Sequence, residues 1–322
     1  MIQRFVFGQP LPTESVVRAL PVCKGPVPFL VPDGEGWRYR LAEDAVVYGL
    51  GEMPRGINKR GWHYVVHNTD ESHHGEDKLS YYGAHNFLLV RSGAEVFGLF
   101  LDFPGRVEYD IGYTRHDALH FAAAEPNYEL YVLTSDSARP EADISKQFRQ
   151  LIGRSYIPPK WAFGLAQSRF GYQCEADVRE VVEGYKAHDL PLDMVCMDID
   201  YMTHFADFTV EKTRFPDLSA LSHELKAAGI RLIPIIDAGI RVDPDDAVCQ
   251  EGLAKDYFCK KADGTPFVAA VWPGKAYFPD FLRPDVRAWF GRQYKVLTDA
   301  GIEGFWNDMN EPAFFYTPER LK

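Results

Sequence analysis

Residues 301–312 read GIEGFWNDMNEP. The first part of this stretch is a short apolar run that ends at Trp306, which is typical of a buried strand. Two carboxylates, Asp308 and Glu311, follow three residues apart, with amide side chains beside them. A large ring, carboxylates and amides together suit a polyhydroxylated ligand, so the stretch indicates a sugar-cleaving site. The alternative is a polar strand-to-helix loop, because Asn, Asp and Pro also favour turns for local reasons.

The second half of the chain repeats the pattern of an apolar run that leads into an acid. Residues 194–199 read MVCMDI and residues 232–237 read LIPIID. Such runs are typical of parallel strands that are covered on both faces. Together with candidate strands at 161–169 and 302–306, they give four strand–helix steps of an α/β fold. A closed (β/α)8 TIM barrel needs eight steps, so we expect the first half of such a barrel over residues 159–322.

Between these strands the chain shows the apolar stripes of amphipathic helices, with apolar residues three or four positions apart. The three stripes are Val178, Val181, Val182 and Tyr185; Leu218, Leu221, Leu225 and Ala228; and Val286, Trp289, Phe290, Tyr294 and Leu297.

Up to about residue 142 the chain has a different sequence pattern, which is typical of short strands separated by turns. Candidate strands at 87–90, 96–101, 107–111 and 128–132 predict an N-terminal antiparallel β-sandwich domain over residues 1–142. A linking helix is expected within residues 143–158, with Ile144, Phe148 and Leu151 on one stripe and Gly153 where a C-terminal cap would lie. The Pro-Pro pair at 158–159 then breaks the chain before the barrel begins.

Three acids follow three of the predicted parallel strands. Asp198, Asp237 and Asp308 each lie at such a strand end, and the active sites of parallel α/β folds gather at the carboxyl ends of the strands. Each acid alone could be a helix cap or a salt-bridge partner. Three acids at the ends of three predicted strands instead favour a single active site to which all three contribute.

Aromatic residues accompany these acids. Phe170, Tyr172, Tyr201, Trp272 and Trp306 all follow or end predicted strands or lie on the long third connection. Stacking faces beside carboxylates suit a pyranose, which has apolar C–H faces and a rim of hydroxyls. The alternative for each ring is a place in the hydrophobic core.

Composition narrows the class of partner. The 322-residue chain carries a net charge of −11 and has no basic stripe, so we expect no nucleic-acid partner and no membrane partner. No apolar run is long enough to span a bilayer, and residues 1–10 lack the apolar core of a signal peptide. The five cysteines are odd in number and scattered, which favours free thiols. A cytoplasmic protein with a neutral partner is the expectation.

Two pairs of histidines could be drawn as a metal site. They are His63 with His67, and His73 with His74 beside nearby acids. Neither pair has a Cys or a third well-spaced ligand, whereas protein zinc sites use three or four protein ligands. A polar surface is the expected explanation, and the sequence implies no metal and no cofactor.

Four stretches of this chain together resemble glycoside hydrolase family 31, and its small bacterial α-glucosidase branch in particular. They are residues 48–52 (YGLGE), 197–202 (MDIDYM), 235–237 (IID) and 306–312 (WNDMNEP). The resemblance extends from near residue 1 to residue 322. It implies a β-sandwich, a (β/α)8 barrel and a retaining, exo-acting α-glucosidase. Such an enzyme hydrolyses terminal α-linked glucose from oligosaccharides through a glycosyl-enzyme intermediate.

The resemblance also implies roles for individual residues. Asp308 matches the nucleophile, and Asp198 matches the acid that holds the hydroxyls at the far end of the sugar in the −1 subsite. Glu311 matches a residue that supports the nucleophile loop, with a purely structural hydrogen bond as the alternative. Asp70 matches a loop that closes the pocket, with a solvated turn as the alternative. The substrate pocket implied in this way also includes Phe170, Ile199, Asp237, Trp272, Trp306, Asn307 and Met309.

Two features depart from the family pattern. Phe170 stands where the family's α-glucosidases commonly carry Trp, which leaves the linkage preference open. The sequence stops at Lys322, ahead of the region where the family keeps its general acid/base Asp, so we expect these 322 residues alone to be inactive and incompletely folded.

Other functions and assemblies remain compatible with the sequence. The alternatives to an α-glucosidase are an α-xylosidase or another α-glycosidase of the family, or a non-catalytic carbohydrate-binding protein. A monomer and a homo-oligomer are both compatible with the sequence.

Overall fold

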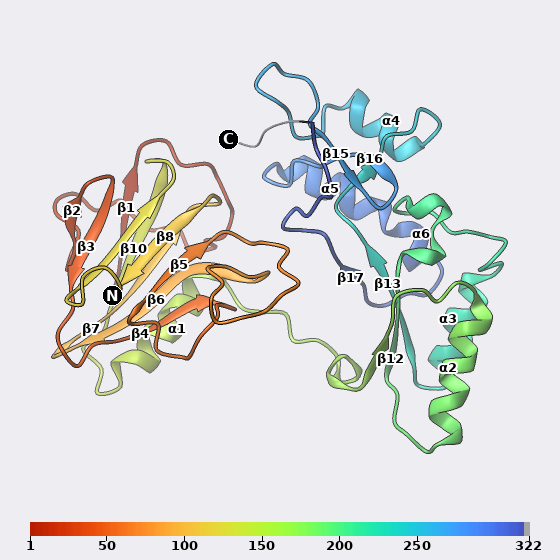
Figure 1. Ribbon diagram of the computed structural model, residues 1–322, viewed down its shortest axis with the longest axis horizontal. Coiled ribbons are helices and arrows are strands. Elements are labelled where there is room, and N and C mark those ends of the chain that lie inside the picture. The colour runs from red at the N-terminus through yellow and green to blue at the C-terminus, as the bar shows by residue number, and fades with distance from the viewer. Residues whose placement is uncertain (319–322) are drawn as a thin grey trace. The chain divides into compact units, whose positions relative to one another are not determined.

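The computed structural model describes residues 1–318. The chain forms two compact units, the first ending at Tyr156 and the second beginning at Ile157 (Figure 1). Each unit has a hydrophobic core of its own.

The first unit is a β-sandwich of two five-stranded antiparallel sheets. One sheet has the order β1 (Ile2–Phe7), β10 (Tyr128–Thr134), β7 (Glu95–Asp102), β6 (Ala84–Ser92) and β4 (Val46–Gly51). The other has the order β2 (Val31–Asp33), β3 (Gly36–Arg40), β9 (Ala118–Ala123), β8 (Val107–Ile111) and β5 (Trp62–Val66). The predicted sandwich is confirmed, and all four strands expected from the sequence are present.

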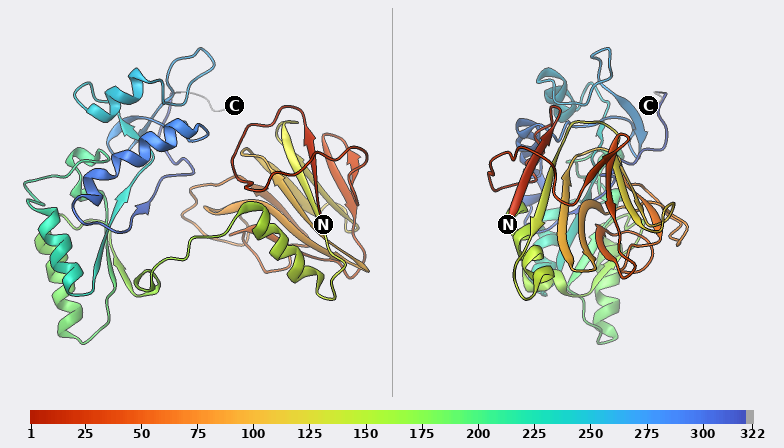
Figure 2. Two further views of the ribbon diagram at one scale, coloured as in Figure 1. Left: turned by 180° about the vertical axis from the view of Figure 1, so that it is seen from behind. Right: turned by 90° about the vertical axis from the view of Figure 1, so that its left-hand side faces the viewer.

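The core of the sandwich follows from the alternation of side chains along each strand. In β6, Leu88 and Val90 are buried between the two sheets, whereas Leu89 faces the opposite side. On that side lies helix α1 (Pro140–Ile152) (Figure 2). Its buried residues Ile144 and Leu151 pack against the sheet at β7 and β10. The helix comes very close to Gly98 of β7, where a Cβ atom would lie 2.8 Å from the Ile144 side chain.

Helix α1 begins three residues before the expected start at Asp143 and ends at Ile152, directly before the predicted C-terminal cap at Gly153. Pro140 lies at the first helical positions, where its fixed φ is compatible with a helix and its missing N–H costs nothing. Gly153 follows the last turn with φ of 92°, a conformation that residues with a side chain rarely adopt.

The second unit is built on a parallel sheet of four strands. The strand order is β11 (Ala166–Ser168), β12 (Met194–Met197), β13 (Arg231–Ile236) and β17 (Trp306–Asn307), which is also their order along the chain. The helices are α2 (Glu175–Ala187), α3 (Leu218–Ala227), α4 (Ala247–Ala254), α5 (Pro284–Gln293) and α6 (Lys295–Thr298). This is the predicted partial TIM barrel.

The first two helices of this unit lie side by side (Figures 1 and 2). Arg179 of α2 and Glu224 of α3 join them in an ion pair of 2.9 Å. Their apolar stripes, including Val178 and Leu221, are buried in the core of the unit as predicted.

Two expectations about the elements of the second unit were wrong in detail, and one small sheet was missed. A 3-10 helix, η1 (Lys160–Phe163), occupies most of the stretch expected as the first strand, which leaves only the three residues of β11. The last strand pairs over two residues rather than 302–306, because Gly304 offers no side chain to pack in a strand. The third connection also holds a small antiparallel sheet of β14 (Ile240–Arg241), β16 (Gly274–Tyr277) and β15 (Val268–Val271).

Candidate active site

The three predicted acids follow three adjacent strands. Asp198 directly follows β12, Asp237 directly follows β13, and Asp308 directly follows β17. These strands are neighbours in the parallel sheet, and neighbouring strands lie about 4.8 Å apart. The Asp308 N–H donates to the carbonyl oxygen of Ile236 at 3.0 Å, which extends the β13–β17 pairing to the nucleophile candidate.

The Asp198 side chain also stabilises the local backbone that follows β12. Asp198 caps the 3-10 helix η2 (Ile199–Tyr201), and its Oδ1 accepts the N–H of Ile199 at 2.8 Å. Its side chain is half-buried. Burial raises the pKa of Asp198, as do the negative charges of Asp308 and Asp200.

Asp237 is the most buried of the three acids. Its side chain is 3% exposed, and within the described residues neither of its oxygens has a hydrogen-bond partner. Burial, followed by the charges of Asp308 and Asp198, raises the pKa of Asp237 to about 7. Because Asp237 responds to both other acids, the three carboxyls share one electrostatic environment, and Asp237 carries a proton part of the time near neutral pH.

The other residues expected at this site surround the ends of the same strands. Ile199 and Met309 are buried, while Trp306 is partly buried and packs against the core of the unit. Asn307 is exposed, and its Oδ1 accepts a hydrogen bond of 2.6 Å from the Tyr294 hydroxyl. Glu311 is half-buried on the turn that follows β17.

Two of the predicted aromatic residues lie together on the surface. Phe170 is 70% exposed and Trp272 is 41% exposed, and their ring centroids are 6.0 Å apart. Phe315 joins them with an edge-to-face contact of 4.8 Å to Trp272. Sequence analysis missed Phe315, because it follows an irregular loop in which no periodicity shows which way a side chain points.

Two further aromatic predictions were wrong. Tyr172 and Tyr201 belong to the buried core of the second unit rather than to an open stacking surface. The Tyr201 hydroxyl donates to the carbonyl oxygen of Ile235 at 2.7 Å. The Tyr201 hydroxyl therefore stabilises the backbone at the end of β13.

A fourth acid of this region, Asp207, was also missed. Its Oδ1 accepts the backbone N–H of Asp237 at 3.0 Å, and its side chain is buried. Asp207 follows the 3-10 helix η3 (Thr203–Phe205) rather than a strand, so the strand-end pattern could not identify it.

Asp70 lies in the first unit, on the exposed connection between β5 and β6. Its Oδ1 accepts a hydrogen bond of 3.0 Å from the Tyr82 hydroxyl. The other predicted site residues all belong to the second unit.

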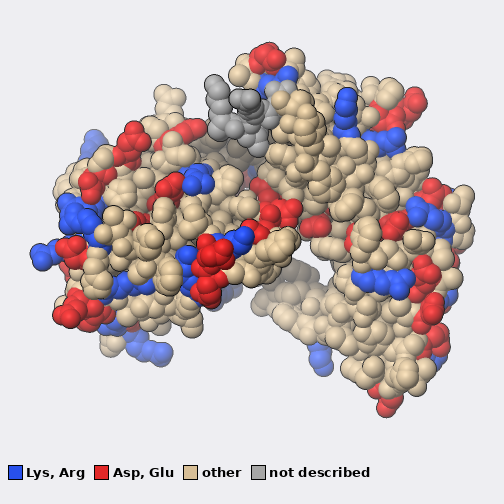
Figure 3. Space-filling model, in the orientation of Figure 1, with Lys and Arg blue, Asp and Glu red and all other residues tan. Residues whose placement is uncertain are grey.

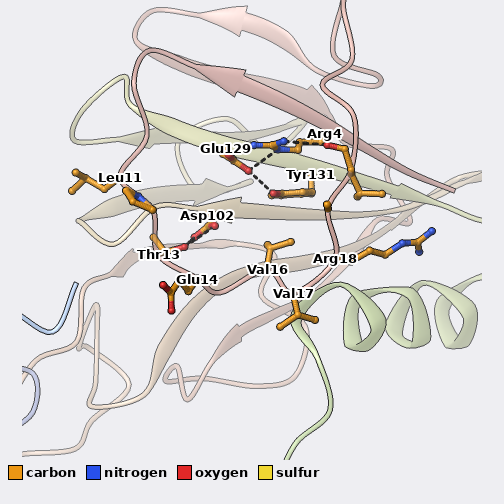
Figure 4. Close-up of a pocket in the computed structure, with 13 residues that line it drawn as sticks. Arg4, Leu11, Thr13, Glu14, Val16, Val17, Arg18, Asp102, Glu129 and Tyr131 are labelled. Carbon is orange, nitrogen blue, oxygen red and sulfur yellow. Dashed lines mark hydrogen bonds and ion pairs between the residues drawn. The ribbon is translucent and has the colours of Figure 1, made fainter. Parts of the chain in front are cut away.

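A pocket in the first unit is a second candidate site. It has a volume of about 390 Å³ and lies between the segment of residues 11–20 and the sheet that contains β1 and β10 (Figure 4). Five of its polar side chains bond to one another: Arg4 and Tyr131 to Glu129, and Thr13 to Asp102. These five groups are partnered within the protein, so the strand-end acids are the stronger candidate.

The described part of the face shown in Figure 3 has no basic patch that would mark another site. On the face shown in Figure 3, Lys and Arg lie among Asp and Glu rather than gathering into a basic patch. Within residues 1–318 no three His, Cys, Asp or Glu side chains are grouped as metal ligands. No helix among those residues is both long enough and apolar enough to cross a bilayer.

Known protein families match both units. The glycosyl hydrolases family 31 TIM-barrel domain matches residues 155–321, and the glycosyl hydrolase 31 N-terminal galactose mutarotase-like domain matches residues 31–110. The chain therefore belongs to glycoside hydrolase family 31, as the resemblance of its motifs implied.

Individual relatives agree with this family. Alpha-glucosidase 2 of Bacillus thermoamyloliquefaciens is 39% identical over 285 residues, which cover 88% of this chain and 36% of the relative. An alpha-glucosidase of Saccharolobus solfataricus is 33% identical over 84% of this chain and 38% of its own length. Alpha-xylosidase 1 of Arabidopsis thaliana is 33% identical over 289 residues, which cover 85% of this chain and 30% of the relative. The chain spans about a third of the length of these curated relatives.

Solved structures show the same fold. The family 31 dextranase of Flavobacterium johnsoniae, in complex with glucose, superposes with a TM-score of 0.77 at 26% identity. The superposition covers 91% of this chain and 35% of the dextranase.

Proposed function

We propose that this protein is a retaining, exo-acting α-glucosidase that removes terminal α-linked glucose from oligosaccharides. The observation that carries the proposal is the position of Asp198, Asp237 and Asp308 at the ends of three adjoining parallel strands. The similarity to two α-glucosidases at 39% and 33% identity supports glucose as the sugar.

In this proposal Asp308 is the nucleophile. Its carboxylate attacks the anomeric carbon and forms a glycosyl-enzyme ester, while the leaving oxygen takes a proton from a second carboxyl group. Asp198 accepts hydrogen bonds from sugar hydroxyls, and a protonated Asp237 can donate one. The exposed rings of Phe170 and Trp272 offer faces on which a sugar can stack.

The test of the nucleophile is Asp308→Asn in the full-length protein, assayed on p-nitrophenyl α-glucoside. The amide keeps the shape of the side chain but cannot form the ester, so kcat should fall by at least about 10³-fold. Asp263→Asn, which makes the same change in an exposed turn, is the matched control and should keep the parent rate. An Asp308→Asn variant that retained a tenth of the parent kcat would exclude Asp308 as the nucleophile.

Two other functions are separated by the same assay with a second substrate. An α-xylosidase is the alternative within the family, because one relative at 33% identity is an α-xylosidase. An α-glucosidase and an α-xylosidase differ in whether the pocket admits the C6 hydroxymethyl group of the sugar. For an α-glucosidase, kcat/KM on p-nitrophenyl α-glucoside should exceed kcat/KM on p-nitrophenyl α-xyloside. Binding of maltose without turnover of either substrate would instead favour a carbohydrate-binding protein.

The proposed location is the cytoplasm. All five cysteines are free thiols, and Cys249 is buried. Free thiols persist in reducing compartments, which supports the proposal. Fractionation of cells that express the native gene is the measurement that tests it.

A further inference from the structure

The buried acid Asp207 has no role in the proposed reaction. Its side chain is only 5% exposed. Its Oδ1 accepts the N–H of Asp237 at 3.0 Å, whereas its Oδ2 has no partner within the described residues. An uncompensated buried carboxylate is costly, so its retention at this place requires an explanation.

The segment that carries Asp207 has a strained backbone. His204, Phe205 and Phe208 have φ of 52°, 59° and 62°, a left-handed conformation that is unfavourable for residues other than glycine. Thr209 holds this segment closed, because its hydroxyl donates to the Ala206 carbonyl at 2.6 Å and accepts the Thr203 N–H at 2.9 Å. Strain of this kind persists only where the surrounding contacts fix it, and it concentrates at functional sites.

The surroundings of Asp207 favour its neutral form. The titratable groups that face it are Asp237, Asp246, Tyr201 and Tyr294. None of these groups is a cation. Burial, together with the charge of Asp237, raises the pKa of Asp207 well above its ordinary value. A protonated carboxyl still offers Oδ1 as an acceptor for the Asp237 N–H.

The hydrogen bond of Asp207 acts at a specific point of the site. Asp237 is the first residue after β13, and its carboxyl oxygens have no partner of their own within the described residues. The direction of that carboxyl therefore depends on how the backbone at residue 237 is held. Asp207 provides the side-chain contact to that backbone N–H.

We propose that Asp207 is a positioning residue which, as a neutral carboxylic acid, holds the backbone of Asp237 and thereby directs the Asp237 carboxyl toward Asp198 and Asp308. This inference rests on the proposed function, because it assigns a task within the same site. In this role Asp207 touches no substrate and acts only through Asp237.

The experiment compares Asp207→Asn and Asp207→Ala in the full-length protein, with kcat/KM on p-nitrophenyl α-glucoside measured from pH 5 to pH 9. Asn keeps an oxygen acceptor and is neutral, so it should retain the parent kcat/KM within about threefold and leave the pH profile unchanged. Ala removes the acceptor and should lower kcat/KM by about 10²-fold, the cost of a small displacement of a catalytic group. The Ala variant also admits water beside Asp237, so the limb of the profile near pH 7 should move to lower pH.

Tyr185→Phe is the matched control. It removes a partly buried hydrogen bond of the same unit, from the Tyr185 hydroxyl on α2 to Gln167 Oε1 on β11, rather than a contact at the end of β13. It should lose thermal stability as the Ala variant does, but keep the parent kcat/KM and pH profile. If the Ala variant does not fold, Asp207→Ser, which retains a shorter hydroxyl, takes its place with the same expected direction.

Three outcomes would overturn the proposal. Equal kcat/KM in Asp207→Ala and Tyr185→Phe at equal loss of stability would reduce Asp207 to a structural residue. A pH profile of Asp207→Asn displaced to lower pH would mean that Asp207 is ionised in the parent protein. A loss of activity in Asp207→Asn as large as that in Asp207→Ala would show that the acceptor is not what matters. Failure of the proposed function is detected separately, by turnover that persists in Asp308→Asn.

Discussion

The raised pKa of Asp237 makes the stability of the second unit depend on pH. The pKa is about 7 in the folded protein and about 3.9 in an unfolded chain, so the folded state binds the proton more tightly. The stabilisation is complete below about pH 4 and is lost as pH rises through about 7. The melting temperature of the parent protein should therefore fall between pH 5 and pH 8.

Asp237→Asn isolates this effect, because its amide does not titrate. The variant should match the parent protein near pH 5 and melt at a higher temperature at pH 8, by about 2–4 °C for each kcal/mol that is regained. Differential scanning calorimetry at both pH values measures the difference. Parallel curves for the two proteins would contradict the assignment of a neutral Asp237 at low pH.

Phe170 should affect the choice of linkage more than the rate of turnover. Its exposed ring lies beside Trp272, and an indole in its place would add stacking area and an N–H donor. Phe170→Trp should change the ratio of kcat/KM on maltose to kcat/KM on isomaltose, with Phe170→Tyr as a control of similar size. An unchanged ratio would mean that Phe170 only packs against its neighbour.

Single residues could be predicted from the sequence where a regular element fixes them. Asp198, Asp237 and Asp308 each follow an apolar run, so their strand-end positions followed from the pattern. Asp207 could not be found in this way, because three left-handed residues precede or follow it and no periodicity describes such a segment. Tyr201 was predicted to be a stacking surface, but the 3-10 turn of η2 directs it into the core.

At the scale of elements, the packing of α1 on the sandwich depends on the absence of a side chain at Gly98. A Cβ atom there would lie 2.8 Å from the Ile144 side chain and 3.3 Å from that of Leu133. Gly98→Ala should therefore destabilise the first unit by about 1–3 kcal/mol. Gly56→Ala is the control, because a Cβ atom at Gly56 meets nothing within 4 Å.

Urea denaturation of the two variants measures both effects. The midpoint for Gly98→Ala should fall with an unchanged slope, which indicates a loss of stability without a change in unfolded-state compactness. The midpoint for Gly56→Ala should stay within error of the parent value. A stabilised Gly98→Ala variant would mean that α1 can move away from β7 without loss.

Elements were predictable to the extent that a continuous pattern defines them. The runs at 194–199 and 232–237 became β12 and β13, because continuous apolar runs are typical of parallel strands that are covered on both faces. The first and last strands were overestimated, since Gly304 and the 3-10 turn η1 interrupt pairing that apolar composition alone suggests. The small sheet of β14, β15 and β16 was missed, because its strands have four residues or fewer.

At the scale of the whole molecule, the first unit has what it needs to fold alone. Its sandwich core and the α1 core are formed by residues within 1–156, and its length lies within the usual domain range of about 50–250 residues. Purified residues 1–156 should give one cooperative thermal transition by circular dichroism. A gradual transition, or strong binding of a hydrophobic dye at 25 °C, would contradict this expectation.

The three acids at the strand ends also allow the protein to distinguish ligands by charge. A sugar-like ring with a protonated nitrogen would be attracted by these carboxyls, and the attraction should grow as Asp237 loses its proton above about pH 7. Calorimetric titration of such an amine should therefore show tighter binding at pH 8 than at pH 6, provided that the amine stays protonated, while a neutral sugar gains nothing over the same range. Molecules that imitate the positive charge of the transition state would thus be favoured under mildly alkaline conditions.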